Sequence, residues 1–144
     1  AKINAELSKK ILPIFGYNKN EINIIKKAIR EHDDKSEINR SIYSIILFES
    51  DKLDTFGKEG FKRWITLGTD DGLSKIETVK GILKIQFKFF NNYNYKLDIS
   101  KKLLKKKARD LFKLILNEIS EKEFNNLVNK YKGEKFINFL NKNN

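Results

Sequence analysis

The stretch from Gly72 to Tyr95 constrains the fold most, because apolar side chains surround most of it when it is placed on a helix. At roughly 100° per residue, these apolar side chains fill an arc of about 200°. They are Ile76, Val79, Ile82, Leu83, Ile85, Phe87, Phe89, Phe90 and Tyr93. The remaining sector carries Glu77, Lys80, Lys84 and Lys88. Because a surface helix needs an apolar stripe of only about 100°, we predict a central helix that is covered on most sides, with the lysines as its only exposed edge.

Apolar residues also recur at helical spacing in the segments before and after this stretch. We predict further helices at residues 3–15, 18–32, 36–48, 50–67, 100–119, 120–131 and 134–141. Gly57 and Gly60 would divide the segment 50–67 into a short turn and a helix from about residue 58. Residues 42–48 would also suit a strand, but no partner strand is visible in the sequence. The pattern therefore predicts an all-α fold, a compact bundle of six to eight helices that forms a single domain over residues 1–144.

Capping and breaking residues mark the ends of several predicted helices. We expect Pro13 to kink or shorten the first helix, and Gly16 to end it. The sequences Asn18-Lys-Asn-Glu21 and Ser120-Glu-Lys-Glu123 both match a capping box. Polar residues predict a break at 94–99, after the central helix, and the alternative is one uninterrupted helix into the next segment. The predicted N-cap of the central helix is one of Thr69, Asp70 and Asp71.

The composition excludes several kinds of site. The chain has no cysteine, which rules out disulfides, thiolate metal sites and cysteine nucleophiles. No apolar run approaches the roughly 18 residues that are needed to cross a bilayer. Because the chain also contains no methionine, we expect a further segment before it, in which a signal or an anchor would lie.

Residues with catalytic or metal-binding chemistry are sparse. The only histidine, His32, lies in a polar segment without a second nitrogen or sulfur ligand, and we expect it to be solvated or to lie at a helix end. Asp51, Asp54 and Glu59 do not have the alternating spacing of a calcium-binding loop. The sequence has no phosphate-binding loop, nucleophile elbow or metalloprotease pair. We therefore predict a protein that is not an enzyme and that needs no cofactor and no metal.

The positive charge is concentrated in one half of the chain. Residues from Gly72 onward include 17 basic and 7 acidic residues, whereas residues 1–71 include 13 basic and 12 acidic residues. A one-sided field of this kind attracts polyanions such as nucleic acid, anionic lipid headgroups or sulfated glycans. The alternative is that the lysines reflect AT-rich codons, because only 4 of the 30 basic residues are arginine. The predicted basic face consists of Lys80, Lys84, Lys88, Lys102, Lys105, Lys106, Arg109 and Lys113.

A second candidate site is apolar. Large apolar side chains on and around the central helix predict either a filled core or a cavity between helices. A cavity of this kind would take an acyl chain whose acidic head meets a lysine at the rim. Periodicity alone does not separate the two alternatives. The residues concerned are Trp64, Leu83, Phe87, Phe90, Phe112 and Ile115.

Three segments occur in a characteristic order: ILPIFGYNKNEINIIKKAI, then FKRWITLGTDDGLSKI leading into the long apolar helix, then FKLILNEISEKEFNNLVNKY. In these segments the chain resembles a helical domain of Borrelia outer-surface lipoproteins, particularly the plasmid-encoded proteins of relapsing-fever species. The low-GC composition and the cysteine-free, all-helical character are similar. The resemblance implies a location on the cell's outer surface, with a lipid on an N-terminal cysteine that this sequence lacks. It also implies virulence-associated contacts with tick or vertebrate host molecules, and it supplies no site motif.

These observations predict a non-enzymatic surface or interaction domain of a bacterial lipoprotein, which binds a host or tick protein, glycan or lipid. An apolar ligand such as a fatty acid, held between helices, is one specific form of this hypothesis. The alternative is an intracellular, cytoplasmic basic protein of plasmid or phage type that binds nucleic acid. Such a protein would need a recognition helix, for which the segment FKRWITLG offers only Lys62 and Arg63.

Overall fold

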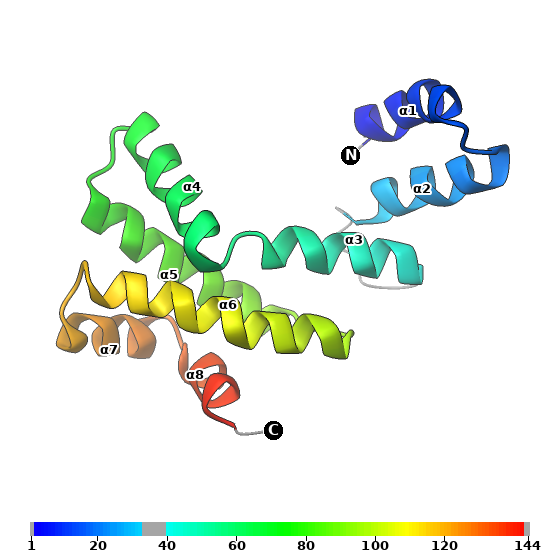
Figure 1. Ribbon diagram of the computed structural model, residues 1–144. Helices are drawn as coiled ribbons and strands as arrows, with labels where there is room; N and C mark the ends of the chain where they lie inside the picture. The colour runs from blue at the N-terminus through cyan, green and yellow to red at the C-terminus, as the bar shows by residue number, and fades with distance from the viewer. Residues whose placement is uncertain (1, 33–39, 143–144) are drawn as a thin grey trace. The chain divides into compact units, whose positions relative to one another are not determined.

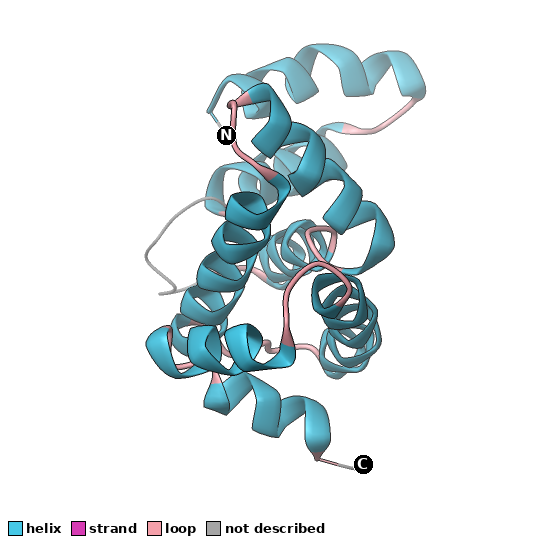
Figure 2. Ribbon diagram, turned by 90° about the vertical axis from the view of Figure 1, so that its left-hand side faces the viewer, coloured by secondary structure: helices cyan, strands magenta, loops and turns pink. Residues whose placement is uncertain are grey.

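The computed structural model describes residues 2–32 and 40–142, and in these residues the chain forms only helices and their connections (Figure 2). The α-helices are α1 Lys2–Ile11, α2 Lys19–Glu31, α3 Ile42–Leu53, α4 Gly57–Asp70, α5 Lys75–Asn92, α6 Asp98–Leu116, α7 Glu121–Lys130 and α8 Glu134–Asn141, and a 3-10 helix, η1, covers Leu12–Phe15. The predicted all-α fold with six to eight helices is confirmed.

Backbone contacts divide the chain into two compact units, which are described separately below. Unit 1 covers Ala1–Lys52, and unit 2 covers Leu53–Asn144. The single domain over residues 1–144 stays a prediction.

In unit 1, α1 and α2 pack against each other as a helical hairpin (Figure 1). Pro13 ends α1 because it has no backbone N–H to continue the helix, and the chain passes into η1. Gly16 follows with φ 84°, and its N–H donates to the carbonyl of Pro13 at 3.1 Å. Asn18 and Glu21 then form a complete capping box at the start of α2. The predicted turn and cap are both confirmed.

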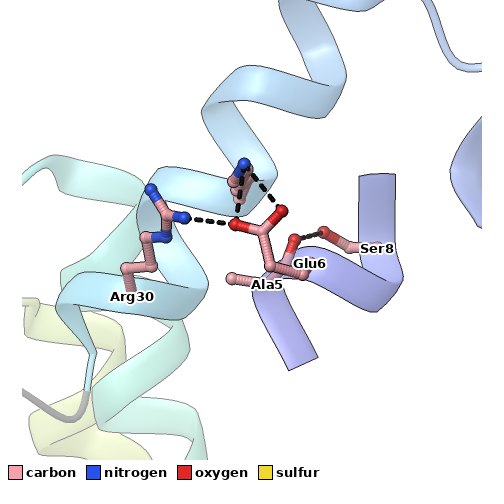
Figure 3. A network of polar contacts seen from close by, with 5 residues as sticks. Ala5, Glu6, Ser8 and Arg30 are labelled. Atoms are coloured by element: carbon pink, nitrogen blue, oxygen red, sulfur yellow. Dashed lines mark hydrogen bonds and ion pairs between the residues drawn. The ribbon is translucent and has the colours of Figure 1, made fainter. Parts of the chain in front are cut away.

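An ion-pair network joins α1 to α2 (Figure 3). Glu6 on α1 accepts from Arg30 on α2, and its carboxylate lies 2.9 Å from the Lys26 ammonium. These contacts, with the hydrogen bond from Lys26 as the largest cause, lower the pKa of Glu6. Close to this network, Ala5 and Ser8 form the buried face of α1. Their small size allows the two helices to approach closely.

One carboxylate links the end of α2 to the start of α3. Glu31 at the end of α2 accepts from the Ser44 hydroxyl at 2.5 Å and from the Ser41 N–H at 3.1 Å. The hydrogen bond from Ser44 is the largest cause that lowers the pKa of Glu31 from 4.5 to about 2. The predicted start of this helix at residue 36 lies outside the described residues. The segment 42–48, for which a strand was the alternative, is helical.

In unit 2, α5 is the central helix and contacts α4, α7 and α8 (Figure 1). Its cap is Ser74, whose hydroxyl accepts from the Glu77 N–H while the Glu77 carboxylate accepts from the Ser74 N–H. The predicted cap at Thr69, Asp70 or Asp71 is therefore wrong. The reason is that α4 extends to residue 70, and a turn at Gly72 with φ 75° separates the two helices.

The central helix is less completely covered than its sequence predicts. Its buried face consists of Thr78, Val79, Ile82, Leu83, Gln86, Phe87 and Phe90. Ile76 and Ile85 are exposed together with Lys84 and Lys88. The prediction that lysines form its only exposed edge is therefore wrong. The arc of apolar residues is wider than the helices packed against it can cover.

The core of unit 2 is an aromatic cluster centred on Phe136 of α8, which is 0% exposed. Its ring stacks on Phe90 with centroids 4.3 Å apart. Three further rings meet it edge to face, with centroid distances of 5.9 Å to Phe56, 6.3 Å to Phe87 and 5.6 Å to Phe112. Aromatic pairs favour these geometries. The short C-terminal helix α8 thus completes a core built from α4, α5 and α6.

Two glycines allow close approaches in unit 2. A Cβ on Gly68 of α4 would lie 2.0 Å from the Thr78 hydroxyl of α5, so these helices cross with no room for a side chain. A Cβ on Gly133, just before α8, would lie 2.8 Å from the Phe87 ring. The predicted break after the central helix is confirmed, because α5 ends at residue 92 and α6 begins at residue 98.

Candidate functional site

The structure distributes the eight residues of the predicted basic face over different parts of unit 2. Lys84 and Lys88 on α5 line a hollow at the end of α7, whereas Lys102 and Lys105 on α6 line another beside α8. Lys106 and Lys113 are exposed on α6. The basic residues of α5 and α6 thus line separate hollows, and their role in binding stays a prediction.

The first hollow, which we call the basic hollow, has a volume of about 330 Å³. Its lining residues are Lys84, Lys88, Asn91, Asn92, Lys130, Tyr131 and Lys132. The last two turns of α5 supply one wall, and the residues around the end of α7 supply the other. Asn91 fixes the two walls together, because its side-chain amide donates to the Lys132 carbonyl at 2.8 Å. Lys132 itself has a positive φ of 55°, which turns the chain sharply between α7 and α8.

No described carboxylate neutralises the four lysines of the basic hollow. Within residues 2–32 and 40–142, none of Lys84, Lys88, Lys130 and Lys132 forms an ion pair, and no acidic residue lines the hollow. The nearby Glu123 is engaged elsewhere, since its carboxylate lies 2.7 Å from the Lys80 ammonium. Lys84 and Lys88 lie one helical turn apart, where like charges repel each other. An anion placed between these lysines would relieve that repulsion.

Other residues of the predicted basic face stabilise the fold. Lys105 donates to the Lys142 carbonyl at 3.0 Å, and Arg109 donates to the Leu140 carbonyl at 2.6 Å. Both carbonyls belong to the C-terminal end of α8, where cations satisfy free acceptors and the negative end of the helix dipole. Lys80 pairs with Glu123 at the start of α7. These three basic residues therefore hold α7 and α8 in position.

Two further hollows share Phe139 and Lys101, and we call them together the amphiphilic hollow. One part, of about 290 Å³, is lined by Phe90, Asn94, Tyr95, Lys101 and Phe139. The other, of about 260 Å³, is lined by Asp98, Lys101, Lys102, Lys105 and Phe139. Aromatic rings form the base of the first part, and lysines line the second. Asp98 pairs with Lys101 at 2.8 Å, which lowers the pKa of Asp98.

The residues predicted to line an apolar cavity are mostly core residues. Leu83, Phe87 and Ile115 are fully buried, Phe90 and Phe112 are nearly so, and Trp64 is half-buried on α4. The ring of Phe136 occupies the space between Phe87, Phe90 and Phe112. Of the six, Phe90 also lines the amphiphilic hollow. Apolar ligand binding therefore stays a prediction, and the amphiphilic hollow is the place where it would occur.

Sequence reasoning did not identify Lys130, Tyr131 and Lys132 as partners of the central helix. They are more than 40 residues away from Lys84 and Lys88, and only the packing of α7 against α5 brings the two segments together. The local signal was the pair of lysines that precede Gly133, the residue that separates α7 from α8.

A hollow of about 530 Å³ on α4 has balanced charge. It is lined by Asp54, Glu59, Lys62, Arg63, Thr66 and Leu67. Arg63 lies 2.6 Å from the Asp54 carboxylate, and Lys62 lies 3.1 Å from that of Glu59. The pKa of Asp54 is lowered by the hydrogen bond from Arg63. These internal ion pairs leave no net charge to attract a ligand.

The predicted metal and acid–base candidates take local roles. His32 caps the end of α2, and its Nδ1 lies 2.6 Å from the carbonyl of Ile29. In the part of the chain that the structure describes, no group of three or more His, Cys, Asp or Glu side chains is placed to hold a metal ion.

Comparison with family models, with curated proteins and with solved structures found no match to this chain. None of the helices in the described ranges combines the length and the apolar character that a membrane crossing requires.

Proposed function

We propose that this chain is a non-enzymatic interaction domain that binds an anionic partner, and that the basic hollow holds the partner's charged groups. The observation that carries the proposal is the set of four lysines around one hollow, in whose lining the described part of the chain places no acidic residue. Some other lysines of unit 2 pair with carboxylates, as Lys75 does with Glu118 at 2.6 Å. The basic hollow differs because four lysines line one concave surface.

The chemistry of the hollow suits sulfate, phosphate or carboxylate groups. Each lysine contributes a compact point charge with three donors, which bridges oxygens without the planar geometry of arginine. The clustered charges reinforce one another in a concave surface, which concentrates anions beside it. Binding should therefore weaken as salt is added, because exposed charges are screened over about 8 Å at physiological ionic strength.

Sulfated glycans are the partner class that we favour over nucleic acid. Sequence-specific DNA binding commonly uses arginine, asparagine or glutamine on a recognition helix, whereas the charged side chains of the basic hollow are all lysines at the ends of α5 and α7. The resemblance to Borrelia surface lipoproteins supports an outer-surface location, where host and tick glycans are accessible. Cytoplasmic nucleic-acid binding is the alternative.

The test compares two variants that lose the same charge at different places. The hollow variant combines Lys84→Gln, Lys88→Gln, Lys130→Gln and Lys132→Gln. The control variant combines Lys58→Gln, Lys106→Gln, Lys113→Gln and Lys122→Gln, four exposed lysines of unit 2 outside the basic hollow. Affinity for a heparin oligosaccharide is measured by calorimetry at about 0.15 M salt.

We expect the hollow variant to lose at least about tenfold in heparin affinity and the control variant to lose much less, because only the first set converges on one site. Equal losses would mean that net charge alone drives binding, and would overturn the proposal. A duplex DNA of equal charge is titrated in parallel. Sub-micromolar, sequence-dependent binding to this DNA would favour the nucleic-acid alternative instead.

A second candidate function is the binding of an apolar ligand with an acidic head, such as a fatty acid. The amphiphilic hollow favours it, because Phe90, Tyr95 and Phe139 provide apolar surface beside the Lys101 ammonium. Native mass spectrometry of gently purified protein, with and without added fatty acid, tests this candidate. Protein that stays ligand-free in both samples would count against it.

A further inference from the structure

In unit 1, α1 leaves its large apolar side chains exposed and buries its small ones. Ala5 is 0% exposed and faces α2 together with Ser8, whereas Ile3 is 76% exposed, and Leu7 and Ile11 are also exposed. Residues 3, 7 and 11 follow one another at four-residue intervals, so they lie along one face of the helix. A helix of a globular protein normally buries such a face. This face of α1 is therefore available for a partner.

The exposed stripe continues into the turn after α1. Ile14 is 79% exposed and Phe15 is 72% exposed, both in η1. This turn is held in shape by Pro13, by the positive φ of Gly16 and by a hydrogen bond from the Tyr17 N–H to the Leu12 carbonyl at 3.3 Å. The two large side chains therefore project from a defined turn. We call Ile3, Leu7, Ile11, Ile14 and Phe15 together the apolar ridge.

The segment that carries the apolar ridge is also cationic. Lys2, Lys9, Lys10 and Lys19 are all exposed on the same segment. The only acidic residue of α1, Glu6, is engaged by Lys26 and Arg30 of α2 (Figure 3), so its charge is locally neutralised. Residues 2–19 therefore carry a net positive charge, and Lys10 is the lysine of α1 that lies next to the ridge.

We infer that the apolar ridge docks onto an anionic lipid bilayer, with Ile14 and Phe15 inserted at the interface and the lysines of residues 2–19 attracted to the headgroups. Apolar side chains next to lysines are the combination that binds the surface of an anionic membrane. A second copy of the chain is disfavoured as the occupant, because each copy carries a net charge of +11 and the lysines beside the two ridges would be brought together. This site lies in unit 1 and is independent of the basic hollow in unit 2.

The experiment measures co-sedimentation of the full chain with two kinds of vesicle, one of phosphatidylglycerol with phosphatidylcholine and one of phosphatidylcholine alone. The ridge variant combines Ile14→Ser and Phe15→Ser. The control variant combines Ile99→Ser and Leu116→Ser, which are exposed apolar residues of α6 in unit 2. All four side chains are exposed, so we expect both variants to fold, and circular dichroism checks their helix content.

We expect the original chain to bind the anionic vesicles. The partition coefficient should fall at least about tenfold in the ridge variant and less than about twofold in the control variant. The hollow variant should keep most of the binding, which separates this proposal from the function proposed for unit 2. Equal losses in the ridge and control variants, or no binding by the original chain, would overturn the inference.

Light scattering on the same samples detects self-association. A dimer that the ridge variant abolishes would show instead that the ridge binds a second copy.

A second measurement follows insertion directly. In a Phe15→Trp, Trp64→Phe variant, the single tryptophan lies at the tip of the ridge. We expect its fluorescence to shift to shorter wavelength with anionic vesicles, as the indole leaves water. An unchanged spectrum in the presence of bound vesicles would contradict insertion of the ridge.

Discussion

The rings of Phe90 and Phe136 stack with their centroids 4.3 Å apart and their planes within 15° of each other. Phe136 is the central ring of the unit 2 core, and its removal would leave a cavity bordered by Phe56, Phe87 and Phe112. We therefore expect Phe136→Ala to reduce the free energy of unfolding by about 3–5 kcal/mol. Urea unfolding followed by the fluorescence of Trp64, the only tryptophan and a residue of α4, measures this loss.

Phe139 provides the control on the same helix. It is half-buried and lies at the edge of the cluster, 5.1 Å from Phe90 between centroids. Phe139→Ala should therefore cost clearly less than Phe136→Ala. Equal losses would contradict the central position of Phe136 in the core.

Two glycines of unit 2 should respond to alanine in opposite directions. A Cβ on Gly68 would lie 2.0 Å from the Thr78 hydroxyl, whereas a Cβ on Gly81 of α5 would meet no atom of the described residues within 4 Å. We expect Gly68→Ala to destabilise the protein by about 1–3 kcal/mol through overpacking. Gly81→Ala should stabilise it by about 0.5–1 kcal/mol, because glycine is unfavourable within a helix.

The clash at Gly68 can be tested further by a double-mutant cycle. Thr78→Ala removes the two side-chain atoms that approach the new Cβ most closely. The combination of Gly68→Ala with Thr78→Ala should therefore be more stable than the sum of the single changes predicts. Additive effects would show that α4 and α5 do not meet at these two residues.

Glu31 should make the stability of unit 1 depend on pH in acid. Its folded-state pKa of about 2 lies below the ordinary 4.5, so the ionised carboxylate favours the folded state. That contribution is complete above pH 4.5 and is lost as the pH falls toward 2. We expect Glu31→Gln to remove this part of the acid sensitivity.

The cause of the low pKa is tested by NMR titration of the Glu31 carboxyl group. Because the hydrogen bond from Ser44 is the largest cause, Ser44→Ala should raise the pKa of Glu31 toward its ordinary value. A carboxyl group that titrates near 4.5 in the unaltered protein would contradict the contact between α2 and α3.

The two serine caps of unit 2 should differ in strength. Ser74 and Glu77 form both halves of a capping box, whereas the Ser120 hydroxyl accepts from the Glu123 N–H and the Glu123 carboxylate pairs with Lys80. We expect Ser74→Ala to cost about 1–2 kcal/mol and Ser120→Ala to cost less. The pKa of Glu77, which Ser74 lowers, should also rise in the Ser74→Ala variant. Urea unfolding and NMR titration measure these effects, and equal costs would contradict the difference.

Features that depend on neighbours in sequence could be predicted from the sequence. The turn at Pro13 and Gly16 and the cap at Asn18 require only a few adjacent residues, and the structure confirms them. The cap of α5 was missed although Ser74 and Glu77 carry the same signal as Asn18 and Glu21. A helix that begins at Gly72 would be capped by a residue before it, whereas α5 begins at Lys75 and is capped by Ser74.

Features that depend on packing could not be predicted in the same way. Periodicity places Ile76 and Ile85 on the apolar arc of α5, but it does not show how much of that arc other helices cover. The basic hollow likewise joins Lys84 and Lys88 to Lys130 through the contact between α5 and α7. The sequence predicted the positive charge of this half of the chain and included Lys84 and Lys88 in the basic face. Only the fold shows that Lys130 and Lys132 line the same hollow.

The position of Phe136 in the chain also sets an order of assembly during synthesis. The four rings that surround it belong to segments that leave the ribosome earlier, since Phe56, Phe87, Phe90 and Phe112 all precede it. Until translation has passed residue 136, these rings lack their central partner and stay available for contacts with other molecules. Domains tend to fold as units in the order of their synthesis. The nascent chain of unit 2 therefore exposes an incomplete aromatic cluster, which favours aggregation. A pause in translation before α8 would prolong this exposure.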